Sequence, residues 1–193
     1  MREFVKLSLS LSIACLIAAI VLAIVHAITA GPIDEQNKRA ELEAVTRTLP
    51  NYDNDPVADK KILTIRDEQK TFYIGKKDGK VVGVAFETFG EGYSGKIFVM
   101  VGITPEGVVS GIQIRSQQET PGLGARITEP SFYNQYKDVS LSMKKGLVNG
   151  KLAVDKDGGN VDSITGATIS SRGVTQAVNI ALEIFKKYKK DII

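Results

Sequence analysis

The first hydrophobic pattern along the chain is an unbroken apolar run near the N-terminus. Residues 7–28 carry no charged side chain and are rich in Leu, Ile, Ala and Val. About 20 such residues form a helix long enough to cross the hydrocarbon core of a bilayer. Arg2 and Lys6 precede the run, which favours a cytoplasmic N-terminus and an extracytoplasmic globular part. The pattern therefore predicts a single-pass anchor, residues 1–30, in the cell (inner) membrane.

The apolar run has two alternative interpretations. A cleaved signal peptide would end near Ala30, but the run is longer than the roughly 7–15 residues usual for a signal core. A lipoprotein signal would end at Cys15, where too little apolar chain precedes the cysteine. We therefore favour a retained helix in contact with the lipid bilayer.

Two changes of pattern follow the anchor. Residues 31–60 are a predicted helical linker, in which charged residues and alanines alternate up to Pro50 and a polar loop follows. From Thr71 onward, short runs rich in β-forming residues flank Asp78-Gly79 and the stretch 105–107, both of which are strong hairpin signals. These signals predict four strands in an antiparallel meander.

The remaining segments predict helices packed on that sheet. Residues 129–138 are expected to form a short helix, and residues 149–159 a strand and a turn. The chain closes with a long helix for which Ser170 or Ser171 is the expected N-cap. Its apolar stripe consists of Val174, Ala177, Val178, Ala181, Ile184, Phe185 and Tyr188. The predicted class is α+β: one transmembrane helix, then an antiparallel sheet packed with helices in a domain of residues 61–193.

Composition and charge limit the classes of function that the chain can have. A net charge of +3 without a basic stripe argues against a nucleic acid partner. The single cysteine, Cys15, and the single histidine, His26, both lie in the apolar run, which excludes Cys/His catalysis and a Cys/His zinc site in the globular part. We expect no metal and no independent catalysis. Hydroxyls, carboxylates, backbone amides or a borrowed cofactor must then carry the function.

The stretch DSITGATISS, residues 162–171, is the strongest candidate site. Thr168 lies at or just before the start of the closing helix, where unpaired amides and the helix dipole favour a phosphate. Gly166 and Ala167 leave room for a planar group against the backbone. Asp162 is placed to fix the turn through an Asx-type bond. A simple glycine turn before a capped helix would explain the same residues without a ligand.

The first seven residues of this stretch, DSITGAT, resemble the flavinylation motif Asp-x-x-(Ser/Thr)-Gly-Ala-Thr of the FMN-binding domain family. That family includes the G subunit of Rnf complexes and the C subunit of sodium-pumping NADH:quinone oxidoreductases. The resemblance implies that Thr168 carries FMN through a phosphoester bond. Thr165, Gly166 and Ala167 are then the preceding motif residues, and Asp162 is the leading acid. A separate flavin transferase is implied as the partner that installs the cofactor.

A second stretch, ETPGLG at residues 119–124, resembles a loop that the family places beside the flavin. Glu119 and Thr120 offer an acceptor and a hydroxyl, and Gly122 belongs to a rigid turn with exposed backbone amides. Leu123 offers an apolar surface to a ring. By itself this loop could equally be an ordinary surface turn.

A third stretch, GEGYSGKI at residues 90–97, also resembles a family sequence. Its Tyr93 either contacts the flavin or packs in the protein, and we favour packing.

The resemblance implies an electron-transfer subunit of an ion-translocating, Rnf-type ferredoxin:NAD⁺ oxidoreductase complex, with other membrane subunits as partners. The length of the chain favours the Rnf protein over its counterpart in the quinone-linked enzyme, which stays an alternative. Two further hypotheses remain open: a membrane-anchored ligand-binding module without redox chemistry, and a structural assembly subunit that carries flavin incidentally.

Overall fold

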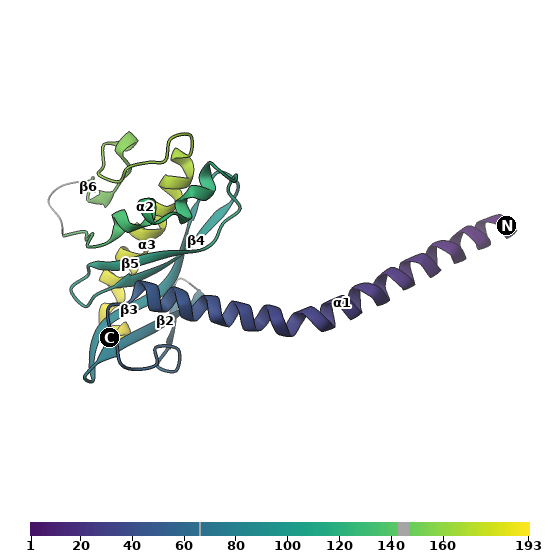
Figure 1. The fold of residues 1–193 in the computed structure, drawn as a ribbon, viewed down its shortest axis with the longest axis horizontal. Helices are drawn as coiled ribbons and strands as arrows, with labels where there is room; N and C mark the ends of the chain where they lie inside the picture. Colours follow the sequence, from purple (N-terminus) through teal and green to yellow (C-terminus); the bar gives the residue numbers. More distant parts are fainter. Residues whose placement is uncertain (66, 143–146) are drawn as a thin grey trace. The chain divides into compact units, whose positions relative to one another are not determined.

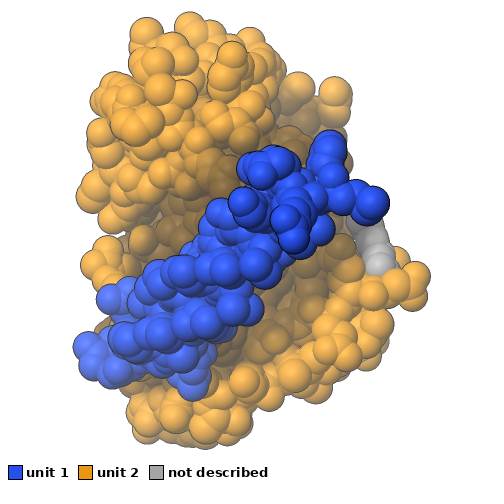
Figure 2. Space-filling model, turned by 90° about the vertical axis from the view of Figure 1, so that its right-hand side faces the viewer, with its two compact units in different colours: residues 1–40 blue, residues 41–193 orange. Residues whose placement is uncertain are grey.

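The computed structural model describes residues 1–65, 67–142 and 147–193, which divide into two compact units, residues 1–40 and 41–193 (Figure 2). Helix α1, Arg2–Thr48, forms the first unit except for Met1, and its last residues belong to the second unit. It is the one helix among the described residues that is long and apolar enough to cross a membrane. The predicted boundaries at residues 30 and 60 stay predictions, since anchor and linker share one continuous helix.

The second unit is built on a five-stranded antiparallel sheet in the order β1-β2-β3-β4-β5 (Figure 1). The strands are β1 Lys61–Ile65, β2 Glu68–Lys77, β3 Lys80–Glu91, β4 Lys96–Ile103 and β5 Val109–Ser116. The four-stranded meander predicted from the sequence is confirmed as β2 to β5. The edge strand β1 was not predicted, because it buries only Ile65 fully and shows no regular alternation.

The β2–β3 hairpin turns where the sequence predicted it. Asp78 and Gly79 have positive φ values of 50° and 74°, and the strands pair directly beside them, Lys77 with Lys80. Two positive φ values at the centre of a two-residue loop are the signature of a type I′ turn, whose twist matches that of the flanking strands. The second predicted hairpin is also confirmed, with Thr104 and Val108 bonded across the turn.

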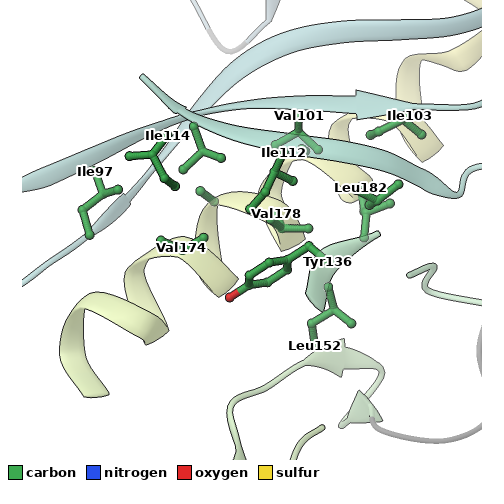
Figure 3. Close-up of a cluster of buried hydrophobic side chains, with 14 of the residues drawn as sticks. Ile97, Val101, Ile103, Ile112, Ile114, Tyr136, Leu152, Val174, Val178 and Leu182 are labelled. Atoms are coloured by element: carbon green, nitrogen blue, oxygen red, sulfur yellow. The ribbon is translucent and has the colours of Figure 1, made fainter. Parts of the chain in front are cut away.

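Helix α3, Thr168–Ile192, covers one face of the sheet and packs against β3 and β4. The predicted apolar stripe is confirmed: its residues are buried in the main core, except that Tyr188 is partly buried. Figure 3 shows side chains of β4 and β5 facing the helix, with Tyr136 and Leu152 closing the cluster. The labelled residues are Ile97, Val101, Ile103, Ile112, Ile114, Tyr136, Leu152, Val174, Val178 and Leu182.

The close approach of α3 to β3 depends on two glycines. A Cβ on Gly90 would collide with the carbonyl of Gly173, and a Cβ on Gly173 would lie 2.7 Å from the carbonyl oxygen of Glu91. Side chains at either position would push the helix off the sheet. The pair therefore holds the first turns of α3 against the sheet.

The opposite face of the sheet carries a smaller core. Ala44 and Val45, from the end of α1 within the second unit, pack with Tyr73, Ala85 and Met100. The linker helix ends at Thr48, before Pro50 as predicted. This part of α1 therefore belongs structurally to the folded domain.

Short elements connect β5 to α3. They are η1 Gly124–Thr128, α2 Pro130–Tyr133, η2 Asn134–Tyr136, β6 Leu147–Val148, β7 Lys151–Leu152 and η3 Asp155–Asp157. The short helix predicted at 129–138 is found as α2 and η2, and the predicted strand as the two-residue β7. Tyr136 is fully buried and shares a 2.8 Å hydrogen bond with Thr175 of α3.

Candidate functional site: a cavity at the start of the closing helix

A cavity of about 630 Å³ lies where three separate segments meet: the β3–β4 connection, the loop after β5, and the start of α3. Its volume is in the range of small-molecule and cofactor sites. The residues that line it are Tyr93, Glu119, Thr120, Leu123, Gly124, Gly166, Ala167, Thr168, Ile169 and Ser170. The fold thus joins residues from all three stretches that the sequence analysis selected.

A tight turn places Thr168 at the cavity. The Ala167 N–H donates to the Ile164 carbonyl at 2.9 Å, and Gly166 occupies the third position of this turn with φ of 79°. A positive φ at that position is typical of a type II turn and favours glycine. The turn ends directly at Thr168, the first residue of α3.

The predicted N-cap, Ser170 or Ser171, is wrong. The helix begins at Thr168, its N-cap is Ala167, and no side chain caps it. Both serine hydroxyls have other partners. Ser171 accepts from the Ile164 N–H and donates to the Ala167 carbonyl, each at 3.1 Å, whereas Ser170 bonds to Glu119. Neither serine hydroxyl therefore caps the first helical turn, whose amides have no partner in the described part of the chain.

At Thr168, a hydroxyl and neighbouring backbone amides all lack a hydrogen-bond partner among the described residues. Its half-buried side chain makes no hydrogen bond within the described part of the chain. The backbone N–H groups of Thr168, Ile169 and Ser170 likewise donate to no described acceptor. Three unpaired amides at the positive end of a 25-residue helix form a receptive place for a phosphate.

Glu119 connects the ETPGLG loop to the helix start. Its side chain is 5% exposed, although it is charged. One carboxylate oxygen accepts from the Ser94 N–H at 2.9 Å, and the other accepts from the Ser170 hydroxyl. The Glu119 N–H donates to the Gln117 side chain at 2.5 Å. Glu119 therefore ties all three segments of the cavity together.

Apolar side chains form the rim of the cavity. Tyr93, Leu123 and Ile169 are 74%, 48% and 45% exposed, and each comes from a different segment. The favoured interpretation that Tyr93 merely packs against the protein is wrong, because its ring is largely exposed beside the cavity. The rim offers an apolar surface to a planar group.

Three of the predicted site residues lie outside this cavity. Gly122 is exposed in the preceding turn, with φ of 75°. Asp162 and Thr165 line a separate depression of about 230 Å³. Within the described chain the Asp162 carboxylate makes no hydrogen bond, so the expected Asx-type bond is not formed; the backbone of Asp162 instead pairs with the Gln135 amide at 2.7 and 3.3 Å.

The sequence analysis missed four residues of the site. Gly124, Ile169 and Ser170 line the cavity, and Ser94 donates its N–H to Glu119. Ile169 and Ser170 follow Thr168 directly, so the helix start that singled out Thr168 also pointed to them. Ser94 and Gly124 lie within the selected stretches 90–97 and 119–124, but their contacts with Glu119 depend on how the fold brings these stretches together.

Comparison with known proteins agrees with this geometry. The model of the family described as "FMN-binding domain" matches residues 92–183, which include the three cavity segments. The chain is 34% identical over 178 residues to the G subunit of the Na⁺-translocating ferredoxin:NAD⁺ oxidoreductase complex of Acetobacterium woodii, covering 84% of this chain and 82% of that one. It is 32% identical over 170 residues to the G subunit of the ion-translocating oxidoreductase complex of Cereibacter sphaeroides, covering 86% and 76%.

Solved structures share the fold. The C subunit of the Na⁺-translocating NADH-quinone reductase from Parabacteroides distasonis aligns with a TM-score of 0.52 and 26% identity, over 70% of this chain and 67% of that one. NqrC of Shewanella oneidensis aligns with a TM-score of 0.54 and 22% identity, over 77% and 73%. The fold and the site thus define an FMN-binding domain on a membrane-anchoring helix. The chain belongs to the family formed by the G subunits of ion-translocating oxidoreductase complexes.

Proposed function

We propose that this chain is an electron-carrying subunit of an ion-translocating, ferredoxin:NAD⁺-type oxidoreductase complex in the cell membrane, and that FMN is attached to Thr168 through a phosphoester bond. The observation that carries the proposal is the lack of hydrogen-bond partners at Thr168, beside a cavity. Its hydroxyl and the three amides around it have no partner in the described chain, and they face a cavity of about 630 Å³. Named relatives are G subunits of such complexes.

The residues present fit both ends of an FMN molecule. The free amides of the first helical turn suit the phosphate, whose remaining negative charge the helix dipole favours. The rim of Tyr93, Leu123 and Ile169 suits the flat, largely apolar ring. Thr120 adds a hydroxyl in the same wall. The flavin supplies the redox chemistry when bound, and the chain supplies attachment, orientation and electrostatics.

Attachment is proposed to require a separate flavin transferase. A threonine hydroxyl is a poor nucleophile unless a base activates it. The part of the chain after His26 contains neither histidine nor cysteine, and no carboxylate of the described residues bonds to Thr168. The chain therefore lacks an obvious means of modifying itself, and an enzyme that transfers the FMN phosphoryl group from FAD to the hydroxyl would release AMP.

The globular domain is proposed to lie on the extracytoplasmic side. Arg2 and Lys6 flank the apolar part of α1 at its N-terminus, whereas Asp34 and Glu35 come first after it. Basic flanks stay on the cytoplasmic side. A covalent tether would then keep the cofactor from being lost outside the cell.

Two threonines of the motif offer a matched test. The full chain, co-expressed with a flavin transferase, is expected to gain the mass of one FMN less water and to fluoresce in a denaturing gel. Thr168→Ala should lose both signals, and Thr165→Ala should keep them, because Thr165 lies in the neighbouring depression. A Thr168→Ala protein that stayed covalently fluorescent would refute the attachment site. A wild-type protein with the bare polypeptide mass would favour a ligand-binding module without covalent flavin.

A further inference from the structure

Glu119 is a buried acidic residue that has no counter-ion among the residues that the structure describes. It is 5% exposed in the wall of the cavity, and none of the ion pairs formed by the described residues includes it. Both of its side-chain partners, the Ser94 N–H and the Ser170 hydroxyl, are neutral. Buried charges are usually paired, because leaving water is costly. An unpaired carboxylate kept at this position therefore calls for a functional explanation.

Two glycines hold the carboxylate in place. A Cβ on Gly92 would lie 2.5 Å from one oxygen of Glu119, and a Cβ on Gly124 would lie 2.6 Å from the other. Glycine at both positions thus makes room for the acidic side chain between the β3–β4 connection and η1. This packing and the two hydrogen bonds together fix the position of the Glu119 carboxylate.

We propose that Glu119 sets the reduction potential of the flavin, acting as a fixed negative charge that makes the cofactor harder to reduce. The inference rests on the proposed FMN site at Thr168. A flavin gains negative charge as it accepts electrons, and a nearby negative charge opposes that gain. The effect of a charge inside a protein is larger than in water, because the surroundings screen it less. Glu119 would thereby hold the flavin at a low potential, suited to relaying electrons from a strong reductant.

The test is Glu119→Gln in the flavinylated full chain. Glutamine has the same shape: its oxygen can accept from the Ser94 N–H, and its amide can donate to the Ser170 hydroxyl oxygen. The substitution therefore removes the charge and keeps both hydrogen bonds. We expect an unchanged flavin content and a midpoint potential that moves in the positive direction. The shift should correspond to at least about a tenfold change in the one-electron equilibrium, or about 59 mV.

Glu91→Gln is the matched control. Glu91 is the exposed last residue of β3, next to the cavity segment, and lies outside the cavity lining. Water screens a charge at such a position. We expect Glu91→Gln to shift the midpoint potential by only a small fraction of the shift that Glu119→Gln causes. Equal shifts in the two variants, or no shift in Glu119→Gln, would overturn the inference.

If Glu119→Gln does not fold, a second variant, Ser170→Ala, tests the proposal. Ser170→Ala keeps the carboxylate and removes one of its two neutral donors, so more of its field reaches the cavity. The potential is then expected to move in the negative direction, and an unchanged or more positive value would overturn the proposal. Failure of the proposed function is distinguishable, because it would appear as wild-type protein without covalent flavin.

Discussion

Glu119 and Ser170 stand 51 positions apart in the sequence, and their side chains share a buried hydrogen bond. One residue opens the ETPGLG loop, and the other lies in the first turn of α3, two residues after Thr168. The bond makes one site from two sequence motifs. Any change that separates the loop from the helix start should therefore affect the cavity and the stability of the fold together.

The hydroxyl of Ser171 is expected to hold the turn before Thr168. Ser171→Ala leaves the buried Ile164 N–H without its acceptor, which costs about 1–3 kcal/mol. We expect a lower free energy of unfolding and slower flavinylation, because the turn that presents Thr168 loosens. Ser116→Ala, at the exposed end of β5, is the control and should change neither. Normal stability of Ser171→Ala would contradict the role of this hydroxyl.

The contact between Gly90 and Gly173 is expected to be intolerant of side chains. Gly90→Ala places a methyl group against the Gly173 carbonyl, and overpacking of this kind costs about 1–3 kcal/mol. Denaturant unfolding of the detergent-solubilised chain measures the loss. In α1, Gly31→Ala meets no atom within 4 Å and should leave the unfolding of the globular domain unchanged. A Gly90→Ala domain as stable as the wild type would show that helix and sheet can separate freely.

Two buried tyrosines predict a loss of stability at alkaline pH. Burial raises the pKa of Tyr136 well above its usual value near 10, and burial together with the Glu41 carboxylate raises the pKa of Tyr73. The unfolded chain then releases these protons at lower pH than the folded chain. The stabilisation is complete below about pH 10 and is lost as the pH rises further, by ~1.4 kcal/mol per pH unit for each tyrosine.

Unfolding measured between about pH 9 and pH 11.5 checks this prediction. Tyr136→Phe should reduce the slope of stability against pH and cost about 1 kcal/mol at neutral pH through the lost hydrogen bond to Thr175. Tyr93→Phe is the control, because the Tyr93 ring is 74% exposed and the substitution removes a hydroxyl from the surface and none from the core. An identical slope in wild type and Tyr136→Phe would contradict the assignment to Tyr136.

The apolar rim is expected to shield the flavin ring. Leu123→Ala removes one of its three large side chains, so iodide should quench the fluorescence of the attached flavin more strongly, with the flavin content unchanged. Ile62→Ala removes a comparably exposed apolar side chain from β1, away from the cavity, and should not alter quenching. Equal quenching in both variants would show that Leu123 does not contact the ring.

Local patterns predicted most of the fold. The hairpin at Asp78-Gly79 and the stripe of α3 each follow from a few neighbouring residues, and the structure confirms them. Strand β1 was missed, since an edge strand with one fully buried residue shows no clear period. The helix start was misplaced for a related reason: Ser170 and Ser171 are good caps by local preference, but contacts with Glu119 and Ile164 engage their hydroxyls.

The site was predictable in its parts, and its assembly was not. Thr168, Leu123 and Glu119 were selected from two short motifs, and they do line one cavity. Ser94 contributes a backbone N–H from the β3–β4 connection, and no sequence pattern predicts this hydrogen bond to Glu119. Asp162 and Thr165 belong to the same motif as Thr168 and nevertheless face the neighbouring depression, because the chain turns between them and the helix.

Covalent attachment of FMN to Thr168 is best tested on protein purified from its own membrane. Tandem mass spectrometry of the peptide that contains residues 162–172 should show the mass of FMN less water on the Thr168 side chain. An unmodified Thr168 in material from an active, flavin-containing complex would contradict the proposal.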